Sequence, residues 1–418
     1  MYVKYPIMGL SYARGRLAIC GGGGSLKSGI RNTVDIYELS DSDPNGFVKE
    51  ITADTGKELA SGVAFSHDGH LLAVSVNPSC WIYKVNPKDK SLTLLIKFRT
   101  DFADDESQQT SACFVGDETI LTGGQDGVVR VWRLTQEASS EEKDKGTASA
   151  LRVADADEED TTNKKTNSDD ETVESPKIGD SVVHGDCVVT LTREYRGHTK
   201  RIREIHVEPS HRNLVVSSSE DQSCHLWRLS ENNAIYTLSK DDAIDEAYQR
   251  LNLKPLTGPR KHQFRCVRFS NDGRALFTVL TPARGDTLLL KWTPSTLTQT
   301  REAEWQWVLS AAIVAGDRPI ASLCVSADDR FVSTGAVPGE VRVYLASDLR
   351  PYKKQSTGEH SFAITGMGFV PPVGASSNST TLHVVTGSAD KQLLRHDVDT
   401  TAGHRRPALA HSLGALRA

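Results

Sequence analysis

Residues 197–227 read GHTKRIREIHVEPSHRNLVVSSSEDQSCHLW and end in a short strand pattern that closes on an aromatic residue. A tight polar turn and a second strand pattern precede it. The same arrangement returns along the chain and gives seven units, whose closing rings are Tyr37, Tyr83, Trp132, Trp227, Trp292, Tyr344 and His396. Only the step from Trp132 to Trp227 is much longer than the others, which indicates one insertion in an otherwise regular repeat.

The repeat predicts an all-β fold. Units of about 40–45 residues with four short strands each are typical of propeller blades. Polar turns separate strand patterns at SHDG (66–69), SNDG (270–273) and SADD (326–329), and Asp-Gly supplies the positive φ of a tight hairpin. We therefore predict a seven-bladed β-propeller over residues 1–403, with four-stranded antiparallel blades.

An aspartate stands six positions before the closing ring in four units: Asp126, Asp221, Asp286 and Asp390. In the fourth unit, Gly197-His198, Asp221 and Trp227 together resemble a WD repeat. That resemblance implies a buried hydrogen-bond network within the blade, which is costly to leave half-satisfied. We expect structural roles for His198, Asp221, Trp227, Asp126 and Trp132, and no serine or cysteine stands where it would complete a catalytic triad with His198.

Charge is unevenly distributed along the 418 residues. The net charge is -5, and residues 136–180 hold 14 acidic and 6 basic side chains, a net of -8, so the rest carries about +3 (-5 minus -8). This balance argues against a nucleic-acid binder. Because residues 136–183 have few apolar side chains, we predict a disordered acidic insertion in the third blade. Residues 404–418 are expected to form a C-terminal tail.

The seven cysteines form no CxxC pair and lie inside apolar runs, so we expect buried free thiols in a reducing compartment. The first residues lack the long apolar stretch of a secretory signal. No run approaches the ~20 apolar residues that span a bilayer. A shorter insertion at 240–262 places Ile244, Tyr248 and Leu251 on one helical face, which predicts a helix packed on the side of the propeller.

The first unit departs from the repeat. Its inner hairpin reads LAICGGGGSLKSGIRNTVDIY, so a glycine-rich excursion from Gly21 to Asn32 replaces a short turn. Glycines kept at an entropic cost indicate positive φ or close backbone approach. Such a loop could bind an anion through its amides or a weakly hydrated cation through its carbonyls; a flexible linker is the third possibility.

A nucleotide-binding P-loop is the main enzymatic alternative. It requires GxxxxGK[ST] between a strand and a helix. Here Leu26 precedes Lys27-Ser28, and residues 33–39 alternate as a strand. We therefore expect neither a bound nucleotide nor covalent chemistry from this chain.

Gly21, Gly22, Gly23 and Gly24, followed by Gly29, Ile30 and Asn32 in the first inner hairpin, resemble the exchange factors for the Sar small GTPase that starts COPII coat assembly. This is the family of Sec-twelve and the prolactin regulatory element-binding protein. The stretches at 264–279, 321–349 and 362–371 are similar to later blades of that family.

The resemblance implies a guanine-nucleotide exchange factor on the cytosolic face of the endoplasmic reticulum. In it, Ile30 and Asn32 would face the GTPase, and loop carbonyls between Gly21 and Asn32 would hold a potassium ion. Family members also carry a transmembrane anchor after the propeller, whereas this sequence ends in RRPALAHSLGALRA. A scaffold or trafficking chaperone without exchange activity is the alternative function.

Overall fold

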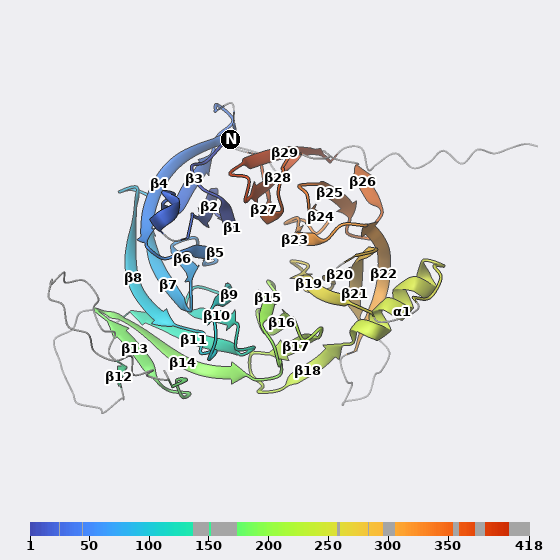
Figure 1. Cartoon of the computed structure of the whole chain (residues 1–418), viewed down its shortest axis with the longest axis horizontal. Coiled ribbons are helices and arrows are strands. Elements are labelled where there is room, and N and C mark those ends of the chain that lie inside the picture. Colours follow the sequence, from blue (N-terminus) through green and yellow to red (C-terminus); the bar gives the residue numbers. More distant parts are fainter. Residues whose placement is uncertain are drawn as a thin grey trace, which may run out of the picture.

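The computed structural model describes residues 1–24, 26–43, 45–136, 150–151, 174–256, 260–282, 284–295, 306–353, 359–372 and 381–400. Seven antiparallel sheets are arranged in a ring around a central opening (Figure 1). Within each sheet the strands follow chain order from the inside outwards, apart from one extension in blade 3. The seven-bladed propeller predicted from the repeat is confirmed.

The first three blades hold the strands up to Tyr195. Blade 1 consists of β1 (Ile7–Ala13), β2 (Arg16–Gly21), β3 (Asn32–Leu39) and β4 (Phe47–Gly56). Blade 2 consists of β5 (Ala60–Phe65), β6 (Leu71–Val76), β7 (Ser79–Asn86) and β8 (Ser91–Arg99). Blade 3 consists of β9 (Gln109–Val115), β10 (Thr119–Gly124), β11 (Val129–Gln136), β14 (Cys187–Tyr195), β13 (Ser181–His184) and β12 (Ala150–Leu151).

The remaining four blades complete the ring. Blade 4 holds β15 (Ile202–Val207), β16 (Leu214–Ser219), β17 (Cys224–Arg228) and β18 (Ala234–Leu238). Blade 5 holds β19 (His262–Phe269), β20 (Leu276–Pro282), β21 (Thr287–Pro294) and β22 (Trp307–Gly316). Blade 6 holds β23 (Ile320–Val325), β24 (Phe331–Ala336), β25 (Val341–Leu345) and β26 (Pro351–Lys353), and blade 7 holds β27 (Ile364–Val370), β28 (Thr381–Ser388) and β29 (Leu393–Asp399).

The acidic insertion differs from its prediction at both ends. Gln136 is the last residue of β11, and β13 (Ser181–His184) forms a hairpin with β14. The β12 backbone pairs with β13 in parallel. The disordered segment predicted over 136–183 is therefore too long, because Ser181–His184 pairs with β14 and Val182 packs against the core of blades 2 and 3. Residues 137–149 and 152–173 of the insertion, and the tail at 404–418, lie outside the described residues.

The predicted side helix is present as α1 (Lys240–Arg250), which begins at the N-cap Ser239. Ile244 and Tyr248 are buried in the core of blades 4 and 5, and Leu251 packs against the same core. In the part of the chain that the structure describes, no helix is long and apolar enough to cross a membrane. All seven cysteines are free, and only Cys113 is partly exposed.

Blade 7 is completed by the N-terminus of the chain. Met1 donates its amino group to the Leu393 carbonyl (2.8 Å) and accepts from the Leu393 amide (2.9 Å), and the Val3 amide donates to the Lys391 carbonyl (2.9 Å). Residues 1–3 therefore lie beside β29 as the outer partner of the last blade. Tyr5 then donates its hydroxyl to Asp35 of β3 (2.8 Å), so the same segment joins blade 7 to blade 1.

Blade 4 contains the buried network that the WD resemblance implies. His198 contacts Asp221 through Nδ1 (3.0 Å) and Ser217 through Nε2 (2.8 Å), and Trp227 Nε1 donates to Ser217 Oγ (2.7 Å). Burial alone would raise the pKa of Asp221, but hydrogen bonds from His198 and Ser223 bring it below its ordinary value. His198 is thus tied to a carboxylate, a hydroxyl and a ring inside the blade. The expectation that no serine stands beside His198 is therefore corrected: Ser217 does, but it is fully buried and accepts from Trp227, so it belongs to the structural network.

Blade 7 repeats this arrangement with different residues. His360 contacts the Asp390 carboxylate (3.1 Å) and Thr386 (2.9 Å), and Thr386 contacts His396 (2.9 Å), which stands where blade 4 has its tryptophan. His360 and Thr386 were not singled out from the sequence. The sequence pattern that could have indicated the role of His360 is its position 30 residues before Asp390, the aspartate of the repeat in this blade.

Blade 3 uses an ion pair where blade 4 uses histidine. Arg130 donates to Asp126 (2.7 Å) and to Glu194 (3.0 Å), and it is fully buried. Trp132 Nε1 donates to Thr122 Oγ1 (2.8 Å). Asp126 and Trp132 therefore lie inside the blade, in the structural positions predicted for them.

The N-terminal closure predicts a backbone-specific loss of stability. In Val3→Pro the amide that donates to Lys391 is removed, whereas Val3→Ala keeps it. We expect Val3→Pro to lower the free energy of unfolding by about 1–3 kcal/mol more than Val3→Ala in denaturant titrations. Equal losses in the two variants would contradict a closing role for this hydrogen bond.

Buried histidines predict acid sensitivity. Burial, with His198 stacked beside it at 4.1 Å between ring centroids, lowers the pKa of His225 from 6.5 to about 4. Between these pH values the unfolded chain binds more protons than the folded chain. The contribution of His225 to the free energy of unfolding is therefore fully present above pH 6.5 and is lost as the pH falls towards 4. In melting curves across this range, His225→Phe should reduce the pH dependence, whereas His211→Phe, at an exposed position, should not. A dependence unchanged in His225→Phe would refute this assignment.

Candidate functional site

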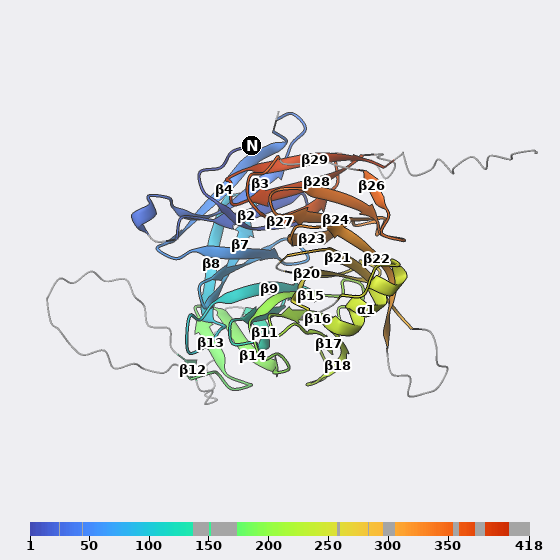
Figure 2. The ribbon, with the colours of Figure 1, turned by 45° about the vertical axis from the view of Figure 1, so that its right-hand side comes forward.

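The glycine-rich loop joins β2 to β3 at the face where β1 begins. Ile7 of β1 pairs with Gly21, so the end of β2 lies beside the start of the blade. The four strands of a blade run alternately up and down, so the loop between the second and third strands lies at the face where the first strand begins. The connection from the preceding blade also reaches the first strand at this face. In Figure 2 the dark-blue loop, with its short 3-10 helix η1 (Leu26–Ser28), stands out from the body of the propeller.

The loop has a buried base and an exposed tip. Gly21, Gly22 and Asn32 are buried, whereas Lys27, Ser28, Gly29 and Arg31 are exposed. Ile30 is half-buried and packs against the core shared by blades 1 and 7. The excursion is therefore neither a flexible linker on the surface nor a segment enclosed within the propeller.

Asn32 holds the base of the loop together. Its Nδ2 donates to the carbonyls of Gly24 (2.8 Å) and Gly56 (3.1 Å), and its Oδ1 accepts from the Gly24 amide (3.1 Å). The residue has no exposed surface. The expectation that Asn32 faces a partner protein is therefore corrected: its amide is fully engaged by the loop backbone and fixes the shape of the loop.

The glycines are needed for this geometry. A Cβ added to Gly22 would lie 2.0 Å from Asn32 Oδ1, so a larger residue would push the amide out of place. Gly21 and Gly23 are similarly crowded, by Pro6 and Ser28 respectively, and Gly24 and Gly29 have φ of +74° and +69°. Three of the four consecutive glycines thus allow neighbouring atoms to approach the backbone closely, and the fourth, Gly24, adopts a left-handed conformation. These are the two reasons for which such glycines were expected.

The potassium expectation can be compared with the oxygens around Asn32. The two carbonyls that converge there, of Gly24 and Gly56, both accept hydrogen bonds from Asn32 Nδ2. That N–H group carries the positive end of the amide dipole and takes the position that a cation would need. The described residues therefore do not fit a potassium cage centred on Asn32. Among the described residues there is also no cluster of three His, Cys, Asp or Glu side chains that could hold a metal.

The exposed tip combines one apolar side chain with two cations. Lys27 and Arg31 flank Ile30 in the sequence and are exposed. Tyr2, 77% exposed beside Gln392 of blade 7, and Phe362, 60% exposed in the connection entering β27, are two aromatic side chains that the sequence did not single out. Such exposed apolar groups are typical of protein contact surfaces rather than of catalytic pockets.

Comparison with known proteins supports the repeat assignment. Residues 99–133 and 186–228, which lie in blades 3 and 4, match the family model described as WD domain, G-beta repeat. No curated protein matches the chain.

The asparagine at the base of the loop predicts a local effect of its removal. In Asn32→Ala the Gly24 amide loses its acceptor, so its hydrogen exchange should accelerate about fivefold or more, because an acceptor of this kind is worth about 1 kcal/mol or more. Amides of β16 in blade 4 should keep their rates and serve as the internal control. Unchanged exchange at Gly24 would show that the loop does not depend on Asn32.

Together, the ring of seven sheets, five of them four-stranded, the buried networks of blades 3 and 4 and the family match over those blades have one interpretation. The chain is a seven-bladed β-propeller that carries WD40 repeats.

Proposed function

We propose that this propeller is a guanine-nucleotide exchange factor for a Sar-type small GTPase at the endoplasmic reticulum, and that the loop of blade 1 is the part that opens the nucleotide site. One observation carries the proposal: a glycine-built loop, cross-linked at its base by Asn32, presents a half-buried Ile30 among the exposed residues of its tip. The motif through Gly21–Gly24, Gly29, Ile30 and Asn32 resembles the exchange loop of the Sec-twelve group.

The mechanism requires preferential binding of the nucleotide-free GTPase. An exchange factor accelerates release only through contacts that are stronger in that state than in the loaded state. A thousandfold acceleration needs roughly 4 kcal/mol of such preference. Burying Ile30 in the partner can supply part of it, and Lys27 and Arg31 would suit an acidic surface around the contact.

The role of Asn32 in this mechanism is indirect. Its three hydrogen bonds fix the loop before the partner arrives, so less conformational entropy is lost on binding. Ile30 is the residue that would contact the GTPase, and Asn32 is a positioning residue. No nucleotide site on this chain is part of the proposal.

A scaffold or trafficking chaperone without exchange activity is the second candidate. The observation that favours it is the half-buried state of Ile30, because part of its side chain already packs against the core shared by blades 1 and 7. Such a propeller would bind the GTPase or its cargo and leave the nucleotide in place.

The test is release of labelled GDP from a Sar GTPase. We expect Ile30→Ala to reduce the stimulated rate by about tenfold or more, since a buried contact residue is commonly worth over 1 kcal/mol. Val48→Ala, at an exposed position of β4, is the matched control. No stimulation by the unaltered chain, combined with stable binding of the nucleotide-free GTPase, would favour the scaffold.

The same assay separates two further possibilities. A rate that is higher in KCl than in LiCl of equal concentration is the result that a loop-bound potassium ion predicts. Rates equal to those of the unaltered chain in both Ile30→Ala and Asn32→Ala would refute the loop as the exchange element. Melting temperatures of each variant show whether a loss of rate reflects a loss of fold.

A further inference from the structure

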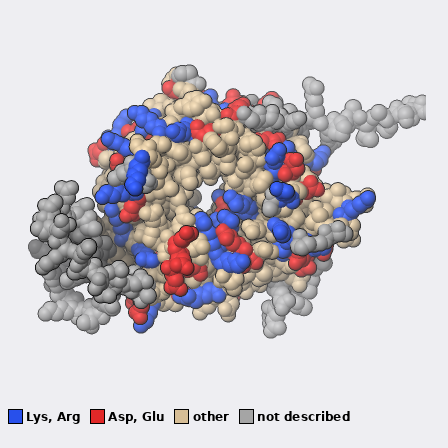
Figure 3. Space-filling view, viewed as in Figure 1, with Lys and Arg blue, Asp and Glu red and all other residues tan. Residues whose placement is uncertain are grey.

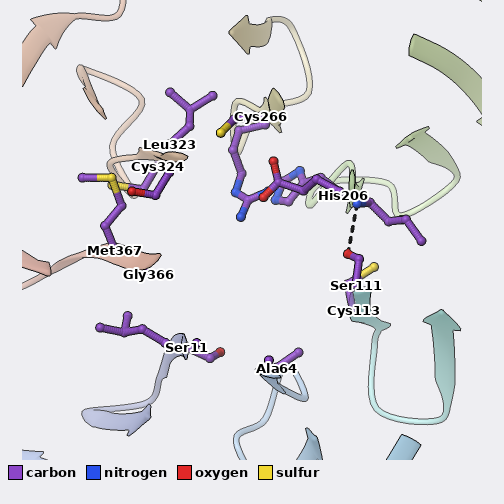
Figure 4. Close-up of a pocket in the computed structure, with 18 of the residues that line it drawn as sticks. Ser11, Ala64, Ser111, Cys113, His206, Cys266, Leu323, Cys324, Gly366 and Met367 are labelled. Atoms are coloured by element: carbon purple, nitrogen blue, oxygen red, sulfur yellow. Dashed lines mark hydrogen bonds and ion pairs between the residues drawn. The ribbon is translucent and has the colours of Figure 1, made fainter. Parts of the chain in front are cut away.

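The central channel of the propeller is charged on one side only. It has a volume of about 550 Å³ and is lined by the innermost strand of every blade. All four of its charged lining residues, Arg203, Glu204, Arg265 and Arg268, come from β15 and β19. The lining from the other five blades is uncharged: Figure 4 shows Ser11, Ala64, Ser111, Cys113, Leu323, Gly366 and Met367 around the opening.

The side of the channel formed by β15 and β19, called here the channel wall, contains one acidic side chain, and this side chain already has hydrogen-bond partners. Glu204 accepts from Arg268 (2.5 Å) and from the backbone amide of Val267 (2.7 Å). Arg203 has a carboxylate partner outside the channel lining, Glu220 at 2.9 Å. Arg265 is exposed and makes no hydrogen bond or ion pair with any residue that the structure describes. The wall therefore keeps at least one guanidinium, that of Arg265, without an ion-pair partner among the described residues.

A fourth guanidinium, that of Arg201, extends this cationic group towards blade 3. Arg201 donates to Gln108 (3.2 Å), a neutral partner. The Nε atoms of Arg201 and Arg203 are buried and have no acceptor among the described residues. Burial, followed by the nearby charge of Arg265, lowers the pKa of Arg203, which is the effect of like charges held close together. Figure 3 shows Lys and Arg side chains gathered over β15 and β19 beside the central opening.

Unpaired donors of this kind favour a carboxylate ligand. Guanidinium groups bind carboxylates through paired, charge-assisted hydrogen bonds, and these are about twice as strong as neutral ones. The channel is too narrow for a folded domain but can take the side chains of an extended chain. Its neutral walls supply hydroxyl and backbone groups, so a lipid surface or a broad apolar partner does not suit it.

We propose that Arg201, Arg203 and Arg265 form a binding site for an acidic, extended peptide segment of a partner protein, across the mouth of the channel at blades 4 and 5. The site lies on the other side of the channel from blade 1 (Figure 1). It is distinct from the glycine-rich loop and does not depend on exchange activity.

The test measures peptide binding with the full chain. A fluorescein-labelled octa-glutamate peptide is the probe, and an octa-glutamine peptide of the same design is the neutral comparison. We expect binding of the acidic peptide that weakens with salt, and a loss of about tenfold for each of Arg203→Gln and Arg265→Gln. Lys88→Gln, at an exposed turn of blade 2, is the control variant and should bind as the unaltered chain does.

Several outcomes would overturn the proposal. These are no binding of octa-glutamate, an equal loss in Lys88→Gln, or tighter binding of a phosphoserine peptide than of octa-glutamate. Arg203→Gln leaves Glu220 without its partner and could disturb the fold, so Arg265→Glu provides a second variant at an exposed and unpaired position. It should abolish binding at an unchanged melting temperature, and retained binding there would refute the site.

Discussion

Closure of the ring by the first residues of the chain is the constraint on which the rest of the structure depends. Seven blades form a propeller only if the last one is joined to the first, and here residues 1–3 hydrogen-bond to β29. Tyr5 continues the link to Asp35 in blade 1, and burial beside that carboxylate raises the pKa of Tyr5 far above its usual range. The closing contact is therefore both a backbone ladder and a buried side-chain hydrogen bond.

The same closure positions the candidate loop. Tyr5 and Ile7 belong to a core that includes Leu393 of blade 7, and Ile30 packs on this core from the loop side. Gly21 lies against the carbonyl of Pro6, so the base of the loop directly contacts the closing segment. A disturbance of the closure would be transmitted to the loop through these packed groups, whereas the channel wall at β15 and β19 stands on blades that the closure does not contact.

Regular features of the fold could be predicted because they repeat. Strand periodicity, the polar turns and the aspartate before four of the seven rings located the blades, and His198, Asp221 and Trp227 meet as the WD pattern implies. What could not be predicted is the direction of a single side chain in an irregular loop. The motif contains Asn32 whether its side chain points outwards or, as found, back to Gly24 and Gly56. The direction of the side chain depends on Gly56, in a strand 24 residues away, so the motif alone does not determine it. The one-sided charge of the channel could not be predicted either, because Arg203 and Arg265 are far apart in sequence and come together only when blades 4 and 5 pack side by side.

The two proposed surfaces differ in how they can contribute to one partner. The loop presents a small apolar contact, and the hydrogen bonds of Asn32 fix its shape before a partner binds. The channel wall presents arginine side chains that could bind an acidic segment in more than one orientation. Because both stand on packed sheets, we expect the occupation of one to leave the other unchanged. A partner that engages both would bind through effective concentration: its acidic segment, once held at blades 4 and 5, would raise the local concentration of its folded part at blade 1, provided that the intervening chain is long enough to cross the face of the ring. Linker length in the partner, rather than a conformational change in the propeller, would then set the affinity.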